Sequence, residues 1–159
     1  MAQVWVKILW LDGVNHKIHL SLGGIETNKG SYILLIEIKK DCIVNLHHKE
    51  IKINKGLYAY IGSAMKNLYQ RVGRHMTFKE KAYQKHWHID GILENKANKI
   101  IFIAMLPSHK RLEEDISKEF AQKFQFIEGF GASDLTVKSN LYLIDNIDYF
   151  FEIIKNFIL

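Results

Sequence analysis

Short apolar stretches separated by closely spaced polar turns fill much of the first half of the chain, which predicts a series of short β-strands. The expected strands cover residues 32–38, 43–46, 51–53 and 57–61. The connections between them are short and polar, and strands joined in this way pair in antiparallel fashion. We therefore expect Tyr32 and Tyr60 to lie on neighbouring strands. Tyr60 shares one face of its strand with Tyr58, and the residues between and beside them form an apolar face.

A four-residue spacing of apolar residues after the glycine turn at Gly62 predicts a helix. Its apolar stripe consists of Met65, Leu68, Val72 and Met76. At about 100° per residue, Arg71 and His75 fall beside this stripe and face the sheet, whereas Arg74 turns toward solvent. An arginine at the edge of a core is costly to desolvate unless a carboxylate or an incoming anion pairs with it. Arg71 therefore marks a candidate anion site.

The second half of the chain shows both periodicities in turn. Helices are expected at 86–94 and 111–124, strands at 100–106 and 137–144, and a last helix after the capping residue Asn146. Residues 1–29 are interpreted as an N-terminal β-hairpin extension, and residues 30–159 as the principal domain. The pattern predicts an α+β fold, with a small, mainly antiparallel central sheet flanked by helices and a C-terminal amphipathic helix.

The composition is that of a single globular domain with a basic balance. The 159 residues are 48% hydrophobic and 25% charged, which are ordinary values for a packed domain. The net charge of +5 favours a polyanionic partner such as nucleic acid. The single cysteine, Cys42, indicates a reducing compartment. No apolar run approaches the about 20 residues of a membrane span, and no signal-peptide pattern is present, so we expect a cytoplasmic protein without a membrane partner.

Several candidate residues have a structural interpretation as well as a functional one. Tyr60 is either a core tyrosine with a satisfied hydroxyl or part of a site. The basic connection 77–85 is either a solvated loop or a surface that holds phosphates. Its candidate phosphate ligands are Lys79, Lys81 and Lys85. The carboxylates at 113–115 would be favoured in the first turn of a helix by the macrodipole alone. The pair His47-His48 falls in a hairpin turn, where exposed histidines are more common than ligands.

Five short motifs, in this order, resemble the GIY-YIG nuclease superfamily. They are Gly30-Ser31-Tyr32, Tyr60-Ile61-Gly62, Leu68-x-x-Arg71-x-x-x-His75, Trp87-His88-Ile89-Asp90 and Gly129-Phe130-Gly131-Ala132-Ser133-Asp134. Ser31 stands where the superfamily's first motif has isoleucine. The last two motifs are similar to an archaeal and bacterial branch that is sometimes fused to an endonuclease III-like glycosylase, which implies a setting in DNA repair.

The resemblance implies phosphodiester hydrolysis with one divalent ion, Mg²⁺ or Mn²⁺. Tyr32 would activate the attacking water, and Tyr60 would orient the water or the phosphate. Arg71 would stabilise charge on the phosphate in the transition state, and His75 would accept the tyrosine proton or bond to phosphate. The superfamily carries its metal ligand on a helix after the third core strand, and Glu113 is the position that best matches it.

Two other interpretations of these residues stay open. The same fold would serve as a binding module that holds nucleic acid, with DNA favoured, without cutting it. Arg71, Arg74 and the three lysines of the basic connection suit either role, with Arg74 gripping a neighbouring phosphate. Alternatively, the chain is a structural interaction protein that uses its final aromatic helix. The orientation of Glu113 separates the nuclease from the binding module, because a carboxylate pointing to solvent would leave only binding. A site plugged by side chains would favour the structural interaction protein.

Overall fold

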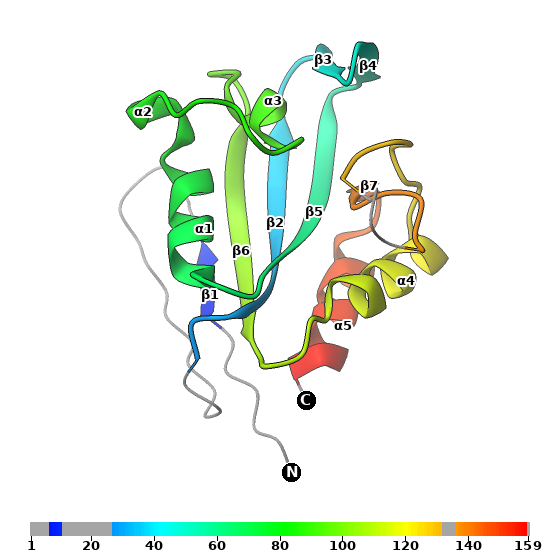
Figure 1. Cartoon of the computed structure of the whole chain (residues 1–159). Coiled ribbons are helices and arrows are strands. Elements are labelled where there is room, and N and C mark those ends of the chain that lie inside the picture. Colours follow the sequence, from blue (N-terminus) through cyan, green and yellow to red (C-terminus); the bar gives the residue numbers. More distant parts are fainter. Residues whose placement is uncertain (1–6, 11–26, 132–135, 159) are drawn as a thin grey trace.

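The computed structural model describes residues 7–10, 27–131 and 136–158, which form a five-stranded antiparallel sheet flanked by helices. The strands of the sheet are β1 (Lys7–Trp10), β2 (Gly30–Ile38), β5 (Gly56–Ala64), β6 (Lys99–Pro107) and β7 (Leu141–Leu143), in the spatial order β1-β6-β2-β5-β7. The helices are α1 (Leu68–Met76), α2 (Phe78–Lys81), α3 (Asp90–Leu93), α4 (Glu113–Lys123) and α5 (Ile147–Ile158). The predicted α+β class is confirmed (Figure 1).

The alternation of side chains along the central strands gives the sheet two apolar faces. Leu34 and Ile36 of β2 pack on the side of α1 and α3. Ile33 and Leu35 point the other way and pack on the side of α4 and α5. Figure 1 shows α1 and the α4–α5 pair on opposite sides of the sheet. A strand buried on both faces reads as a continuous apolar run, which explains the composition of β2 and β6.

The pairing of β2 with β5 brings the two motif tyrosines together, as the sequence predicts. In the antiparallel register, Tyr32 lies opposite Gly62, and Leu34 lies opposite Tyr60. Both tyrosines belong to the apolar cluster on the α1 side of the sheet. Their ring centroids are 6.4 Å apart, so the two phenols share one region of this face.

Two further strands form a separate two-stranded ribbon instead of joining the main sheet. β3 (Cys42–Leu46) pairs with β4 (Lys49–Ile53), and the turn between them contains His47 and His48, as predicted. The ribbon packs on α3 at close range. A Cβ built on Gly91 would lie 2.6 Å from Cγ1 of Val44, so only glycine permits this approach.

Two predicted elements are shorter than expected. Of the strand predicted at 137–144, only Leu141–Leu143 belongs to the sheet. Just before it, the backbone N–H of Asn140 bonds to the carbonyl of Phe130 (2.8 Å), and the side chain of Ser139 accepts the N–H of Leu141 (3.0 Å). Of the helix predicted at 86–94, only Asp90–Leu93 is helical.

The two ends of the chain extend and cover the sheet. β1 comes from the N-terminal extension and pairs with β6, whereas the second strand of the predicted hairpin lies outside the described residues. Asn146 Oδ1 accepts the N–H of Tyr149 (3.1 Å) at the start of α5, which confirms the predicted cap. Phe150 and Ile154 of α5 are buried against the sheet. In the part of the chain that is described, every helix is too short or too polar to cross a membrane.

Candidate active site

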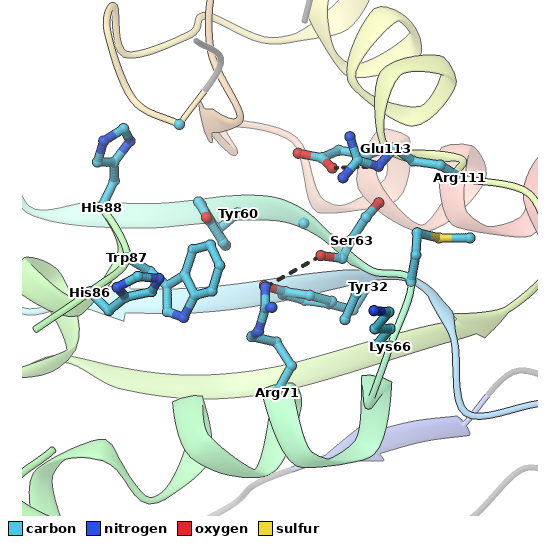
Figure 2. Close-up of a pocket in the computed structure, with 14 residues that line it drawn as sticks. Tyr32, Tyr60, Ser63, Lys66, Arg71, His86, Trp87, His88, Arg111 and Glu113 are labelled. Atoms are coloured by element: carbon cyan, nitrogen blue, oxygen red, sulfur yellow. Dashed lines mark hydrogen bonds and ion pairs between the residues drawn. The ribbon is translucent and has the colours of Figure 1, made fainter. Parts of the chain in front are cut away.

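A polar cavity of about 690 Å³ opens beside the C-terminal half of β5. Residues that line it include Tyr32, Tyr60, Ser63, Lys66, Arg71, His86, Trp87, His88, Arg111 and Glu113. Figure 2 shows Arg71 and Trp87 on one side, Glu113 and Arg111 on the other, and the two tyrosines between them. The cavity thus unites four of the five residues predicted as catalytic. The fifth, His75, lies behind Tyr32.

Tyr32 is a buried phenol whose position depends on the glycine opposite it. A Cβ on Gly62 would overlap Cζ and Oη of Tyr32, so glycine is needed for the ring to cross β5. The Tyr32 hydroxyl lies 2.9 Å from Nε2 of His75. Burial raises the pKa of Tyr32 well above its usual value, although the Arg71 guanidinium opposes this shift. The phenol is therefore protonated at neutral pH.

His75 connects Tyr32 to a carboxylate on α3. Its Nδ1 lies 4.0 Å from Oδ1 of Asp90 and has no hydrogen-bond partner among the described residues. Burial lowers the pKa of His75 to about 4, with Arg71 and Arg74 acting in the same direction and Asp90 against it. A neutral imidazole accepts one hydrogen bond and donates one, so the Tyr32 hydroxyl donates to Nε2 when the ring proton is on Nδ1.

Asp90 organises the loop before α3. It is fully buried, and its carboxylate accepts hydrogen bonds from the backbone N–H groups of His86 (2.8 Å) and Trp87 (2.9 Å). Burial works against its charged form, but these bonds and the Arg74 guanidinium lower the pKa of Asp90. These backbone bonds explain why residues 86 and 87 form a loop instead of the predicted helix. They also fix Trp87 at the cavity wall.

The prediction that Arg74 turns toward solvent is wrong. Its guanidinium donates to both carboxylate oxygens of Asp90 (2.9 Å each) and to the carbonyl of Gln84 (2.9 Å), and its side chain is only 19% exposed. The helical phase assigned to Arg74 is compatible with this position. However, the loop that carries Asp90 packs on that side of α1, where the sequence pattern predicted water.

Arg71 presents a guanidinium to the cavity, as predicted. Its Cζ lies 3.8 Å from the centroid of the Trp87 ring, a cation–π contact that fixes the plane of the group. Its Nη1 donates a long hydrogen bond, 3.4 Å, to the carbonyl of Ser63. The ion pairs found among the described residues do not include Arg71. The guanidinium also interacts with the Tyr32 hydroxyl, and it lines the cavity at a place where an anion would meet it.

Glu113 approaches the tyrosines from the first residue of α4. The buried Ser31 hydroxyl contacts Oγ of Ser63 (2.9 Å) and accepts the N–H of Leu112 (3.0 Å), which ties the start of α4 to β2 and β5. Asn140 donates its side-chain amide to Glu113 Oε1 (2.8 Å). The Nε of Arg111 lies 4.0 Å from Oε2. The carboxylate is therefore held in a fixed orientation at the cavity wall.

Tyr60 lies deeper, between the tyrosine–histidine pair and the loop that follows α4. Its ring centroid is 6.4 Å from that of His75, and Gly131 lines the cavity beside it. Burial raises the pKa of Tyr60 well above its usual value, and the neighbouring Tyr32 acts in the same direction. The loop motif predicted at residues 129–134 is described only as far as Gly131.

The three lysines predicted to hold phosphates lie outside the cavity. Lys79 donates to the carbonyl of Asn98, Lys85 pairs with Glu94 at 2.8 Å, and Lys81 is exposed on α2. The cations that do line the cavity, besides Arg71, are Lys66 and Arg111, which sequence reasoning missed. Their only signal in the sequence was position, since Lys66 lies two residues after β5 and Arg111 lies two residues before the start of α4.

The donors around the cavity fit a hard divalent cation better than a soft one. In the described ranges, no three histidine, cysteine or acidic side chains cluster in a way that would hold a metal. Mg²⁺ is commonly bound by one or two carboxylates, with water and substrate phosphate completing its octahedron. Glu113 lies beside an open cavity of sufficient size for such ligands, so the residues present fit one Mg²⁺ or Mn²⁺.

The fold and the cavity define an α+β protein with a polar site suited to an anionic ligand. The chain belongs to the family described as "Domain of unknown function DUF123", whose model matches residues 31–158. No curated protein and no solved structure matches the chain.

Proposed function

We propose that this protein is a metal-dependent endonuclease of the GIY-YIG type that hydrolyses phosphodiester bonds in nucleic acid, with DNA as the favoured substrate. The supporting observation is that Glu113 of α4 lines the same cavity as Arg71 of α1, Tyr32 and Tyr60, although α1 and α4 cover opposite faces of the sheet. Partly desolvated charges are costly unless something offsets that cost. A substrate phosphate would do so for Arg71, whereas Asn140 and Arg111 already contact Glu113.

Arg71 and Glu113 would act on opposite charges of the substrate complex. The guanidinium stacked on Trp87 keeps its N–H donors directed at the cavity, where they would stabilise negative charge that develops on the phosphate. The Glu113 carboxylate would hold the divalent ion, with Asn140 keeping the carboxylate in place. When bound, Mg²⁺ or Mn²⁺ neutralises charge on the phosphate and on the departing oxygen.

Tyr32 and His75 would handle the proton of the attacking water. The Tyr32 hydroxyl would accept that proton as its own proton passes to Nε2 of His75, 2.9 Å away. The Asp90 carboxylate, 4.0 Å from Nδ1, would stabilise the imidazolium that results. This relay replaces a free phenolate with an imidazolium. Because burial lowers the pKa of His75 to about 4, the imidazolium is also costly to form at pH 7, so Asp90 and the bound phosphate would have to stabilise it.

A reducing cellular interior is the proposed location, in keeping with the nucleic-acid substrate. Cys42, the single cysteine of the chain, is a free thiol, and structural disulfides are rare in that compartment. We therefore propose a cytoplasmic location. The role in DNA repair that we propose rests on the resemblance to the branch that is sometimes fused to a glycosylase.

The test is cleavage of supercoiled, branched and single-stranded DNA, and of RNA, by the full chain with Mg²⁺ or Mn²⁺. Glu113→Gln is expected to abolish cleavage and to leave binding largely intact, because the amide still accepts the hydrogen bond from Asn140 but is a poor ligand for a hard cation. Glu114→Gln is the matched control. Glu114 neighbours Glu113 on α4 but contacts Thr136 and Lys118 and not the cavity.

Three outcomes distinguish the alternatives. Cleavage by the wild type and by Glu114→Gln, with none by Glu113→Gln, supports the proposal. If the wild type binds but cuts no substrate with either ion, the protein is a binding module, a role that the raised pKa values of Tyr32 and Tyr60 would also suit. If Glu113→Gln cuts as well as the wild type, Glu113 does not hold the metal.

A further inference from the structure

Two histidines far apart in sequence meet at the end of the cavity. His47 lies in the β3–β4 turn, and His88 lies in the loop before α3. Their Nε2 atoms are 2.7 Å apart, and their rings are nearly perpendicular, with centroids 4.8 Å apart. His88 lines the cavity (Figure 2), so the pair connects the ribbon to the cavity's rim.

The backbone around His47 supports a fixed position for its ring. Both turn residues have left-handed backbone conformations, with φ of 46° at His47 and 67° at His48. Asparagine and glycine are the usual residues there, so two histidines make this turn strained. The contact of Val44 with Gly91 keeps the ribbon against α3. The strained turn therefore places the imidazole of His47 against His88. The imidazole of His48 is exposed.

The chemistry of the pair is that of a soft-metal site. Two Zn–N bonds of about 2.0–2.1 Å at a tetrahedral angle separate the nitrogens by about 3.3 Å, which a small rotation of either ring would provide from 2.7 Å. Phe130 contacts the other side of His88, with ring centroids 6.2 Å apart.

We propose that His47 and His88 bind one late first-row transition-metal ion, such as Ni²⁺, Cu²⁺ or Zn²⁺, through their Nε2 atoms. Water or an external ligand fills the remaining positions, because the described residues supply no third donor. Imidazole prefers these ions, whereas carboxylate prefers Mg²⁺ and Mn²⁺. The site is thus separate from Glu113 and independent of the proposed nuclease activity. A bound ion would fasten the ribbon to the rim of the cavity.

The test is equilibrium dialysis and calorimetry of the untagged full chain with Ni²⁺ and with Zn²⁺. His47→Asn removes one ligand and keeps a residue that tolerates the left-handed conformation. His48→Asn is the matched control, since it makes the same substitution at the next turn position. The wild type and His48→Asn are expected to bind one ion per chain. His47→Asn and His88→Gln should each weaken binding at least tenfold, because even outer-shell partners of metal ligands cost about 10–100-fold when mutated.

Other results would overturn the proposal. These are a wild type that binds neither ion, an affinity unchanged in His47→Asn, and an equal loss in His48→Asn. Glu113→Gln should bind Ni²⁺ as the wild type does, and excess Mg²⁺ should not displace it. Displacement by Mg²⁺, or loss in Glu113→Gln, would place the ion at the carboxylate and contradict the histidine site.

Discussion

His75 is a buried imidazole whose charge state is set by its surroundings. Burial, Arg71 and Arg74 oppose the imidazolium, and Asp90 favours it, with a resulting pKa of about 4. The unfolded chain binds its histidine proton near pH 6.5. Between these two values the unfolded state holds more protons than the folded state. The free energy of unfolding therefore falls as the pH falls from 6.5 toward 4, and the contribution is fully present above 6.5.

We expect the His75 resonances to show a neutral ring down to about pH 4 in an NMR titration. The associated loss of stability across the window is roughly 3 kcal/mol at most. His75→Gln should flatten the pH dependence of urea unfolding in this window. His86→Gln, which changes an exposed histidine, should not. Titration of His75 near pH 6.5 would contradict the burial of its ring.

At the scale of single elements, α4 depends on a contact with the strands. Ser31 is fully buried, and its hydroxyl accepts the N–H of Leu112 and contacts Ser63. On the proposed GIY-YIG assignment, Ser31 stands where the first motif has isoleucine, and its hydroxyl would give that departure a structural role. It supplies a hydrogen-bond acceptor for the first turn of α4, whose N–H groups have no partners within the helix.

Ser31→Ala should lower the free energy of unfolding by about 1–3 kcal/mol, because it leaves the N–H of Leu112 without an acceptor. It should also loosen Glu113 and reduce any cleavage activity. Ser63→Ala is the control, since it keeps the bond between Ser31 and Leu112. Urea unfolding of both variants measures the difference. Equal losses in the two variants would argue against a special role for Ser31 at the start of α4.

The sequence pattern predicted the central elements because β2 and β5 are apolar runs buried on both faces, and because the burial of α1 repeats with the period of a helix. β2, β5 and α1 are of this kind, and Tyr32, Tyr60 and Arg71 could be assigned with them. The errors lie where side chains replace regular backbone pairing. Asp90 holds the loop before α3, and Ser139 bonds to the strand that follows it. Such contacts join distant segments and leave no periodic signal.

At the scale of the whole molecule, the distribution of cations predicts where nucleic acid would lie. Lys66 lines the cavity, whereas Lys81 is exposed on α2 outside it. On the proposed function, Lys66→Gln should weaken binding of duplex DNA and lower the slope of log affinity against log salt by about 0.9 if the lysine contacts one phosphate. Lys81→Gln removes the same charge and should leave the slope unchanged.

Fluorescence anisotropy over a range of salt concentrations measures both slopes. A larger effect from Lys81→Gln would show that nucleic acid binds along the basic connection 77–85 and not in the cavity. A wild-type slope near zero would contradict nucleic-acid binding itself and would count against the proposed function.

The crossing of Tyr32 over Gly62 constrains the order in which this site can evolve. While the phenol is present, any side chain at 62 overlaps it, so substitution there is selected against even if Gly62 has no chemical role. Loss of Tyr32 first would remove that selection, and the glycine would then be free to change. A lineage that followed this path could not regain the phenol by one reversion, because the glycine would have to return beforehand. Loss of the site would therefore be difficult to reverse.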